Sequence, residues 1–202
     1  MGHEFSGIVG EVGADVSRID VGDRVTVEPN IPRDDCLYCE DGKYHLCKNA
    51  VAVGFHTGAG GFAENAVVPE QQVHVLPDEV SLEEGALVEP LAVGLHAVRQ
   101  SGLSVGDTVD VFGCGPIGLT AISAADAAGA RRIFASEQNG TRRDVAVELG
   151  ADVGINPIEE DVVEIIREQT PDGVDIALEF AGISSAFNSA VRSTRPPEPS
   201  LP

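Results

Sequence analysis

The sequence contains little lysine, few aromatic residues and no tryptophan. Only Lys43 and Lys48 are lysines, and 33 acidic residues outnumber 13 basic ones, which gives a net charge of −20. This charge argues against a nucleic-acid partner, because phosphate binding requires a positive field. Dispersed acid with scarce lysine is also typical of cytoplasmic proteins from salt-loving (halophilic) organisms, which is our hypothesis for this chain.

Long apolar runs are also absent. None approaches the roughly 20 residues that a membrane-spanning helix needs, and the chain does not open with a secretory signal. Three of the four cysteines lie close together at ligand spacing. Metal binding in a reducing compartment is therefore favoured over a disulfide framework. We expect a cytoplasmic protein without a membrane partner.

The first ninety residues are rich in glycine, valine and turn signals. The stretches "FSGIVGEVG", "GDRVTVEP" and "GFAENAVVP" predict short strands bounded by glycine or proline. Ser81 and Glu84 form a capping-box pattern, and Pro90 and Gly102 are placed to begin and end a helix. The sequence therefore predicts a compact β-rich domain over residues 1–95.

From residue 106 the chain alternates strand and helix. Apolar strands are predicted near residues 108, 132, 153 and 175, and each is followed by a helical pattern. This alternation predicts an α/β fold with a doubly wound parallel sheet in the order 3-2-1-4. We expect this second domain to span 96–195 and residues 196–202 to form a disordered tail.

The first strand of this domain runs into a glycine-rich loop, Gly113-Cys114-Gly115-Pro116-Ile117-Gly118. A G-x-G-x-x-G between a strand and a helix is typical of Rossmann dinucleotide-binding domains, in which the helix N-terminus binds the pyrophosphate. The alternative is a glycine turn that binds no nucleotide. Cys114 is interpreted as a small packing residue.

The next strand ends at Glu137, 19 residues after the loop. Its carboxylate can accept hydrogen bonds from both ribose hydroxyls and would repel a 2′-phosphate, so NAD is favoured over NADP. Arg142 and Arg143 lie just beyond and leave NADP open. The predicted cofactor-binding residues are Gly113, Gly115, Pro116, Ile117, Gly118, Glu137 and Arg142.

His3, Glu4 and Glu89 are candidate ligands of a catalytic metal. An imidazole with carboxylates suits a zinc ion that keeps a position open for substrate. Without further context, the alternative is that His3 and Glu4 are an ordinary polar pair that binds no metal.

A resemblance supports the metal. The stretches "GHEFSGIVGEVG", "GDRVTVEPNIP", "GGFAENAVVPEQQVHVLPD" and "EGALVEPLAVGLHAVRQSGLSVGDTVDVFGCGPIGL" occur in this order. Together they resemble the zinc-dependent medium-chain dehydrogenases, nearest the butanediol and sorbitol dehydrogenase branch. The resemblance implies a GroES-like zinc-binding domain, a Rossmann domain and hydride transfer from a secondary alcohol, diol or polyol to NAD(P). It also implies homo-oligomeric relatives, and it gives His3, Glu4 and Glu89 the catalytic zinc.

The same resemblance gives a meaning to "PRDDCLYCEDGKYHLC". The family's structural zinc site has four cysteines, and Cys36, Cys39 and Cys47 match the last three, whereas Arg33 stands in the first position. Asp34 or its neighbour Asp35 can supply an oxygen, since zinc accepts carboxylate. We expect a site of Cys36, Cys39, Cys47 and Asp34, with a lost site as the alternative.

The resemblance also implies segments that this sequence does not contain. Relatives carry several dozen residues before "GHE", including a zinc-ligating cysteine, and further strands after residue 195. We therefore expect a chain truncated at both ends, with a partial GroES-like domain, a Rossmann sheet lacking its last strands, and reduced or no activity. A non-catalytic dinucleotide-binding remnant, a threonine-dehydrogenase-type member and the zinc-free quinone reductase branch remain alternatives.

Overall fold

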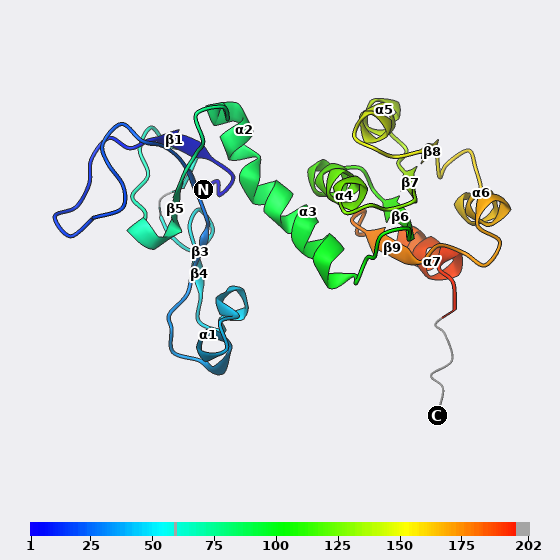
Figure 1. The fold of residues 1–202 in the computed structure, drawn as a ribbon, viewed down its shortest axis with the longest axis horizontal. Coiled ribbons are helices and arrows are strands. Elements are labelled where there is room, and N and C mark those ends of the chain that lie inside the picture. The colour runs from blue at the N-terminus through cyan, green and yellow to red at the C-terminus, as the bar shows by residue number, and fades with distance from the viewer. Residues whose placement is uncertain (59, 197–202) are drawn as a thin grey trace. The chain divides into compact units, whose positions relative to one another are not determined.

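The computed structural model describes residues 1–58 and 60–196. They divide into two compact units, Met1–Glu89 and a second unit from Pro90 onward (Figure 1). The boundary falls inside helix α3 (Val88–Gln100), a few residues before the predicted one at 95–96. Most of the predicted C-terminal tail, residues 197–202, lies outside the described residues.

The first unit is built on a small antiparallel sheet. Its strands are β1 (Ser6–Ile8), β2 (Arg24–Val27) and β5 (Val73–Val75), in the order β1-β2-β5. Ile19, Val25 and Val73 form a buried cluster beside it. A second pair, β3 (Asn30–Ile31) and β4 (Val51–Ala52), frames the cysteine-rich segment, which contains α1 (Leu37–Glu40) and the 3-10 turn η1 (Tyr44–Leu46). Another 3-10 turn, η2 (Glu70–Gln72), precedes β5.

The strand predicted for "GFAENAVVP" does not form. Within the described residues, the backbone of 61–69 pairs with the start of the chain only at its first two residues: Gly61 donates to the carbonyl of Gly2, and Phe62 donates to that of Met1. Val67 is 91% exposed. The prediction was wrong because a short apolar stretch forms a strand only where a neighbouring backbone completes the ladder.

One helix closes the first unit, and a second begins at its end and continues into the second unit. Helix α2 (Leu82–Ala86) begins with the predicted capping box: the hydroxyl of Ser81 accepts the Glu84 N–H, and the Glu84 carboxylate accepts the Ser81 N–H at 2.7 Å. Gly85 lies against Leu76 and Ser6, where a Cβ atom would be 2.5 Å from the leucine side chain. Helix α3 follows almost immediately and ends before Gly102, which has φ +76°.

The second unit confirms the predicted α/β sheet. Strands β6 (Thr108–Phe112), β7 (Arg132–Ser136), β8 (Val153–Ile155) and β9 (Ile176–Glu179) are parallel, in the order β8-β7-β6-β9. In sequence terms this is the predicted order 3-2-1-4. The carboxyl ends of β6 and β9 therefore flank the point where the chain reverses its direction across the sheet, which is where such folds bind ligands.

Helices cover both faces of this sheet (Figure 1). Helices α4 (Pro116–Ala127) and α5 (Gly140–Glu148) contribute Ala121, Ile122 and Ala146 to a buried cluster with Val109 and Val111. On the other face, residues of α6 (Val162–Gln169) and α7 (Ser184–Ser193) pack against Phe112, Phe134 and Ile155. Every residue of β6 is buried, and Val109 and Val111 belong to one layer while Phe112 belongs to the other, as expected for a parallel strand covered on both faces.

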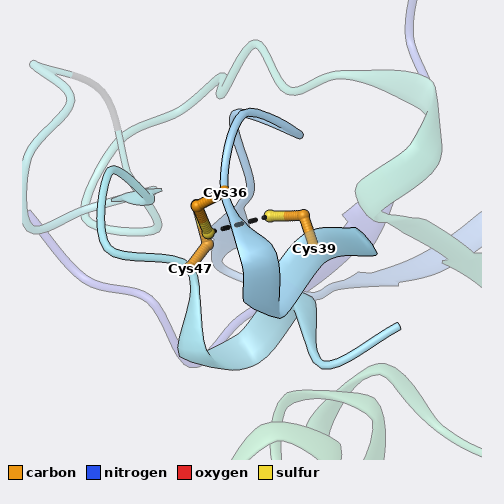
Figure 2. Close-up of side chains that lie close together, drawn as sticks. All are labelled: Cys36, Cys39 and Cys47. Carbon is orange, nitrogen blue, oxygen red and sulfur yellow. Dashed lines mark hydrogen bonds between the residues drawn. The ribbon is translucent and has the colours of Figure 1, made fainter. Parts of the chain in front are cut away.

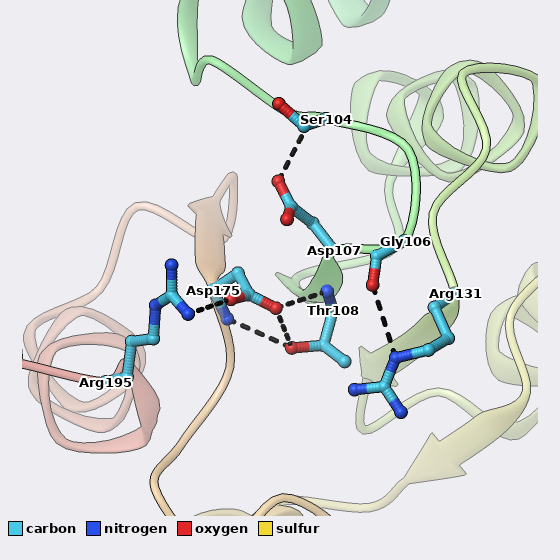
Figure 3. Close-up of polar contacts among 7 residues, drawn as sticks. All are labelled: Ser104, Gly106, Asp107, Thr108, Arg131, Asp175 and Arg195. Atoms are coloured by element: carbon cyan, nitrogen blue, oxygen red, sulfur yellow. Dashed lines mark hydrogen bonds and ion pairs between the residues drawn. The ribbon is translucent and has the colours of Figure 1, made fainter.

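A polar network joins the beginnings of β6 and β9 (Figure 3). The Asp175 carboxylate accepts both the backbone N–H of Thr108 at 2.7 Å and its hydroxyl at 2.6 Å, and pairs with Arg195 at 2.8 Å. Burial alone would raise the pKa of Asp175, but these hydrogen bonds and the guanidinium lower it overall. Beside this network Thr194 forms an isolated parallel bridge with Val174, so the chain returns to the sheet edge after α7.

Replacing Asp175 by alanine should destabilise the second unit by about 2 kcal/mol, because Thr108 is buried and would lose the acceptor of both donors. The Arg195→Ala variant removes only an ion pair whose arginine is 48% exposed, and should cost less than about 1 kcal/mol. Urea unfolding followed by circular dichroism measures both. Equal losses in the two variants would contradict the assigned role of Thr108.

No helix among the described residues combines the length and the apolarity needed to cross a membrane.

Candidate metal centres and dinucleotide loop

The segment that carries His3 and Glu4 is held by close backbone packing. Gly54, Gly60 and Gly61 lie against residues 1–5, and a Cβ atom at Gly54 or Gly60 would lie only 2.0 or 2.5 Å from the carbonyl oxygen of Gly2. Larger residues would therefore displace this segment. The hydroxyl of Ser6 donates to the carbonyl of Leu82 and ties β1 to α2, which leads into the first turn of α3, where Glu89 lies.

These contacts bring the three predicted catalytic ligands together. One ligand atom each from His3, Glu4 and Glu89 lies within 4.8 Å of the others, and His3 Nε2 is 3.9 Å from Glu4 Oε1. Two ligands on one tetrahedral zinc lie about 3.4 Å apart, given bonds of about 2.1 Å. The nitrogen and oxygen donors therefore fit zinc after small side-chain rotations.

The surroundings of these ligands are partly apolar. The ring of Phe55 lies 4.2 Å from that of His3, a contact that nothing in the sequence pattern indicated. Burial raises the pKa of Glu89, the neighbouring Glu4 raises it further, and His3 opposes the shift. A divalent cation would relieve this repulsion between the two carboxylates, which is a physical reason for a metal at this position.

The three cysteines also converge (Figure 2). Cys36 and Cys39 come from the start of α1 and Cys47 from the end of η1, and their sulfur atoms all lie within 4.8 Å of one another. The Cys36 and Cys39 sulfurs are 3.6 Å apart. Two thiolates on one tetrahedral zinc are about 3.8 Å apart, because each Zn–S bond is about 2.3 Å. The donor set fits zinc.

The thiols of this segment differ in acidity. Hydrogen bonding from the backbone of Lys48, with a further contribution from Cys39, lowers the pKa of Cys36 to about 7. Burial, together with hydrogen bonds to Cys47 and Cys36, raises the pKa of Cys39 to about 11. The N–H of Lys48 was not predicted, since a backbone donor has no sequence signature.

The group of converging ligand atoms contains the three thiols and does not contain Asp34. Asp34 is exposed and has φ +54°, and its backbone lies within hydrogen-bonding reach of Cys39. The carboxylate of its neighbour Asp35 accepts from the side-chain amide of Asn49 at 3.0 and 3.2 Å.

The glycine loop has the geometry that its sequence predicts. Gly113 has φ +87°, and a Cβ there would be 2.8 Å from the Ala181 backbone. At Gly118 a Cβ would be 1.9 Å from the carbonyl oxygen of Gly113, so α4 packs directly on the turn. Gly115 differs, because a Cβ there would meet no atom within 4 Å. Pro116 is the first residue of α4.

Glu137 is joined to the same loop. It is 7% exposed, and its Oε2 accepts the backbone N–H of Cys114 at 2.9 Å, while Oε1 accepts that of Asn139 at 2.8 Å. Cys114 itself is fully buried, and burial first, then the charge of Glu137, raises the pKa of its thiol to about 12. It is therefore a packing residue and an inert thiol.

A cavity of about 680 Å³ opens at this edge of the sheet. Gly113, Gly115, Glu137 and Arg142 line it, whereas Pro116, Ile117 and Gly118 lie behind the lining, in the first turn of α4. Arg143 is turned to the backbone and donates to the carbonyl of Glu137 at 2.8 Å.

Further lining residues were missed, and five of the polar ones are Ser136, Glu160, Ser185, Ser189 and Arg192. Four of the five follow the ends of β8 and β9, and position relative to the strand ends was the signal that could have found them. A larger, more open hollow of about 930 Å³ beside α6 and α7 contains no residue of the glycine loop.

Comparisons with known proteins agree with both halves of this arrangement. Residues 1–78 match the family model of the alcohol dehydrogenase GroES-like domain, and residues 116–197 match that of the zinc-binding dehydrogenases. The chain belongs to the zinc-dependent medium-chain alcohol dehydrogenase family.

The chain is 47% identical to (R,R)-butanediol dehydrogenase and 39% identical to sorbitol dehydrogenase, both of Bacillus subtilis strain 168. The matches cover 96% of this chain and 55% and 56% of those proteins. A zinc-binding dehydrogenase from Sinorhizobium meliloti 1021, solved with NADP, superposes with a TM-score of 0.91 at 40% identity, over 96% of this chain and 57% of the other. The chain thus spans about half the length of these relatives.

Proposed function

We propose that this chain supplies the metal-binding and dinucleotide-binding residues of an oxidoreductase that transfers hydride between a secondary alcohol, diol or polyol and NAD(P). The observation that carries the proposal is the convergence of His3, Glu4 and Glu89 on one point. The glycine loop and its cavity in the second unit support it.

When bound, zinc would lower the pKa of the substrate hydroxyl and the nicotinamide ring would accept the hydride. His3 would hold the metal through a ring nitrogen and Glu89 through a carboxylate oxygen. Glu4 would complete the group or balance its charge from behind. The ring of Phe55 would fix the plane of the imidazole and exclude water from one of its faces.

The second unit would bind the dinucleotide. Gly115 leaves space for the pyrophosphate at the N-terminus of α4, and Gly113 and Gly118 shape the turn. The Glu137 oxygens keep lone pairs for the ribose hydroxyls, and its negative charge disfavours a 2′-phosphate, so we propose NAD as the preferred cofactor. Arg142, which lines the same cavity, is the residue that would tolerate NADP.

The cysteine cluster of Cys36, Cys39 and Cys47 is proposed to hold a second, structural zinc, which requires reduced thiols and therefore suits the cytoplasm.

Zinc analysis and dinucleotide binding test the proposal on the purified 202-residue protein. The His3→Ala variant should lose one zinc per chain and keep both the thiolate-bound zinc and NAD binding. His74→Ala is the matched control, because His74 pairs with Glu28 in the same unit and lies outside the converging group. Unchanged zinc content in His3→Ala would contradict the metal assignment.

Turnover is measured in the same samples as NADH formation with butane-2,3-diol, sorbitol or L-threonine. Zinc-dependent turnover that His3→Ala abolishes supports the hydride-transfer role of the chain itself. NAD binding without turnover in a fully zinc-loaded sample favours the non-catalytic dinucleotide-binding alternative for this chain.

A further inference from the structure

Among the described residues, the cysteine cluster gathers three side-chain ligands, one fewer than tetrahedral zinc requires. We propose that Cys36, Cys39 and Cys47 bind a thiophilic divalent metal through three thiolates, and that the fourth coordination position is taken by a small ligand from solution. This inference rests on the metal proposed above for the cysteine-rich segment of the first unit, and it is independent of the proposed hydride transfer.

The three thiols form a preorganised donor set. Cys36 and Cys39 are separated by the first turn of α1, which fixes their sulfurs 3.6 Å apart, and η1 returns Cys47 to the same point. Tyr44, in η1, donates its hydroxyl to the Glu28 carboxylate at 3.3 Å and so ties this segment to the end of β2. The cluster is therefore anchored before any metal arrives.

The neighbouring acidic side chains are placed differently. Asp34 turns at φ +54° and approaches Cys39 through its backbone, and its carboxylate stays outside the converging group. The carboxylate of Asp35 is engaged by Asn49. Arg33 is exposed, and its guanidinium has no lone pair to offer a metal. The described residues near the cluster thus supply three ligands.

The three thiols are buried to different degrees, and one side of the cluster is accessible to solvent. Cys47 is buried, whereas Cys36 and Cys39 are half-buried, so a ligand from solution can reach the metal beside them. Water or a low-molecular-weight thiol fits that position, since zinc accepts both oxygen and sulfur. A metal with an exchangeable ligand is also released more readily to a chelator than one enclosed by four thiolates.

Cobalt substitution tests the open position. Co²⁺ bound by thiolates shows a charge-transfer absorption in the near ultraviolet that grows with the number of sulfur ligands, and a site made of His3, Glu4 and Glu89 does not contribute to it. Adding 2-mercaptoethanol to the cobalt protein should raise this absorption by about one third, because three sulfur ligands become four. An unchanged spectrum would overturn the proposal.

Two variants identify the fourth ligand. In Arg33→Cys a fourth thiolate should give the higher absorption without added thiol and remove the response to it, and should slow zinc release to a chelator at least tenfold. In Asp34→Asn the spectrum, the response and the release rate should match the parent within twofold. An Asp34→Asn protein that binds cobalt at least tenfold more weakly than the parent would show that Asp34 is the ligand, contrary to the proposal. Failure of the parent to bind cobalt at the thiols would overturn it as well.

Discussion

The Gly115→Ala variant is expected to fold as stably as the parent and to bind NAD on the order of 100-fold more weakly, a loss of about 2.7 kcal/mol in binding free energy. The added methyl group meets no protein atom within 4 Å, and the residue has the ordinary φ of −70°. The space it enters is the one that we assign to the pyrophosphate. Fluorescence titration with NADH measures the binding.

Gly118→Ala is the companion variant, with the opposite expectation for stability. Its Cβ would lie 1.9 Å from the carbonyl oxygen of Gly113, which is backbone and cannot rotate away. Overpacking of this kind should destabilise the second unit by about 3 kcal/mol. If Gly115→Ala binds NADH as the parent does, the loop is a structural turn and does not bind a dinucleotide.

A second large effect is expected at Asp110, in the middle of β6. Its side chain is fully buried, Ser136 approaches one oxygen at 3.4 Å, and among the described residues Oδ2 has no hydrogen-bond partner. Asp110→Val should stabilise the second unit by on the order of 3 kcal/mol at neutral pH, because it removes an uncompensated ionisable group from the core. Urea unfolding followed by circular dichroism gives the difference.

The gain should depend on pH with a definite sign. Burial raises the pKa of Asp110 well above its ordinary value of 3.8, with Ser136 opposing weakly. Above pH 3.8 the unfolded chain releases this proton while the folded chain retains it, so the parent loses stability as pH rises. The advantage of Asp110→Val should therefore grow from pH 4 towards pH 7.

Asp110→Asn is the matched control, because it keeps the size and polarity and removes the titration. Its stability relative to Asp110→Val should not change with pH between 4 and 7. A parent whose stability relative to either variant is constant over this range would show that the carboxyl is not the source of the effect.

The glycine loop and the strand order could be predicted because their signals are local. A turn that requires glycine at Gly113 and Gly118, and a strand that ends directly before Glu137, are visible within thirty residues of sequence. The capping box at Ser81 is equally local. The convergence of Glu89 with His3 was different, since it followed from a family resemblance and joins residues that are distant in sequence.

What could not be predicted depends on contacts that have no pattern of their own. The segment 61–69 is bounded by glycine and proline like a strand but lacks a continuous partner, and Phe55 reaches His3 from a turn. The orientation of Asp34 follows from a left-handed backbone that its residue type permits but does not dictate. That Asp110 Oδ2 has no hydrogen-bond partner among the described residues could not be predicted either, because a carboxyl group in a strand gives no indication of what surrounds it.

The hydrogen bond from the Cys114 backbone N–H to the Glu137 carboxylate has a consequence for coenzyme engineering. The carboxylate proposed to discriminate between NAD and NADP is also the acceptor that holds the glycine turn in place. Replacing Glu137 by a residue with a shorter side chain to favour NADP would remove this hydrogen bond and loosen the turn. The binding of NAD and of NADP would then both become weaker. Glutamine at this position discards the negative charge and keeps one carbonyl oxygen for the Cys114 N–H, but its NH2 group cannot accept the Asn139 N–H, so one of the two hydrogen bonds is lost.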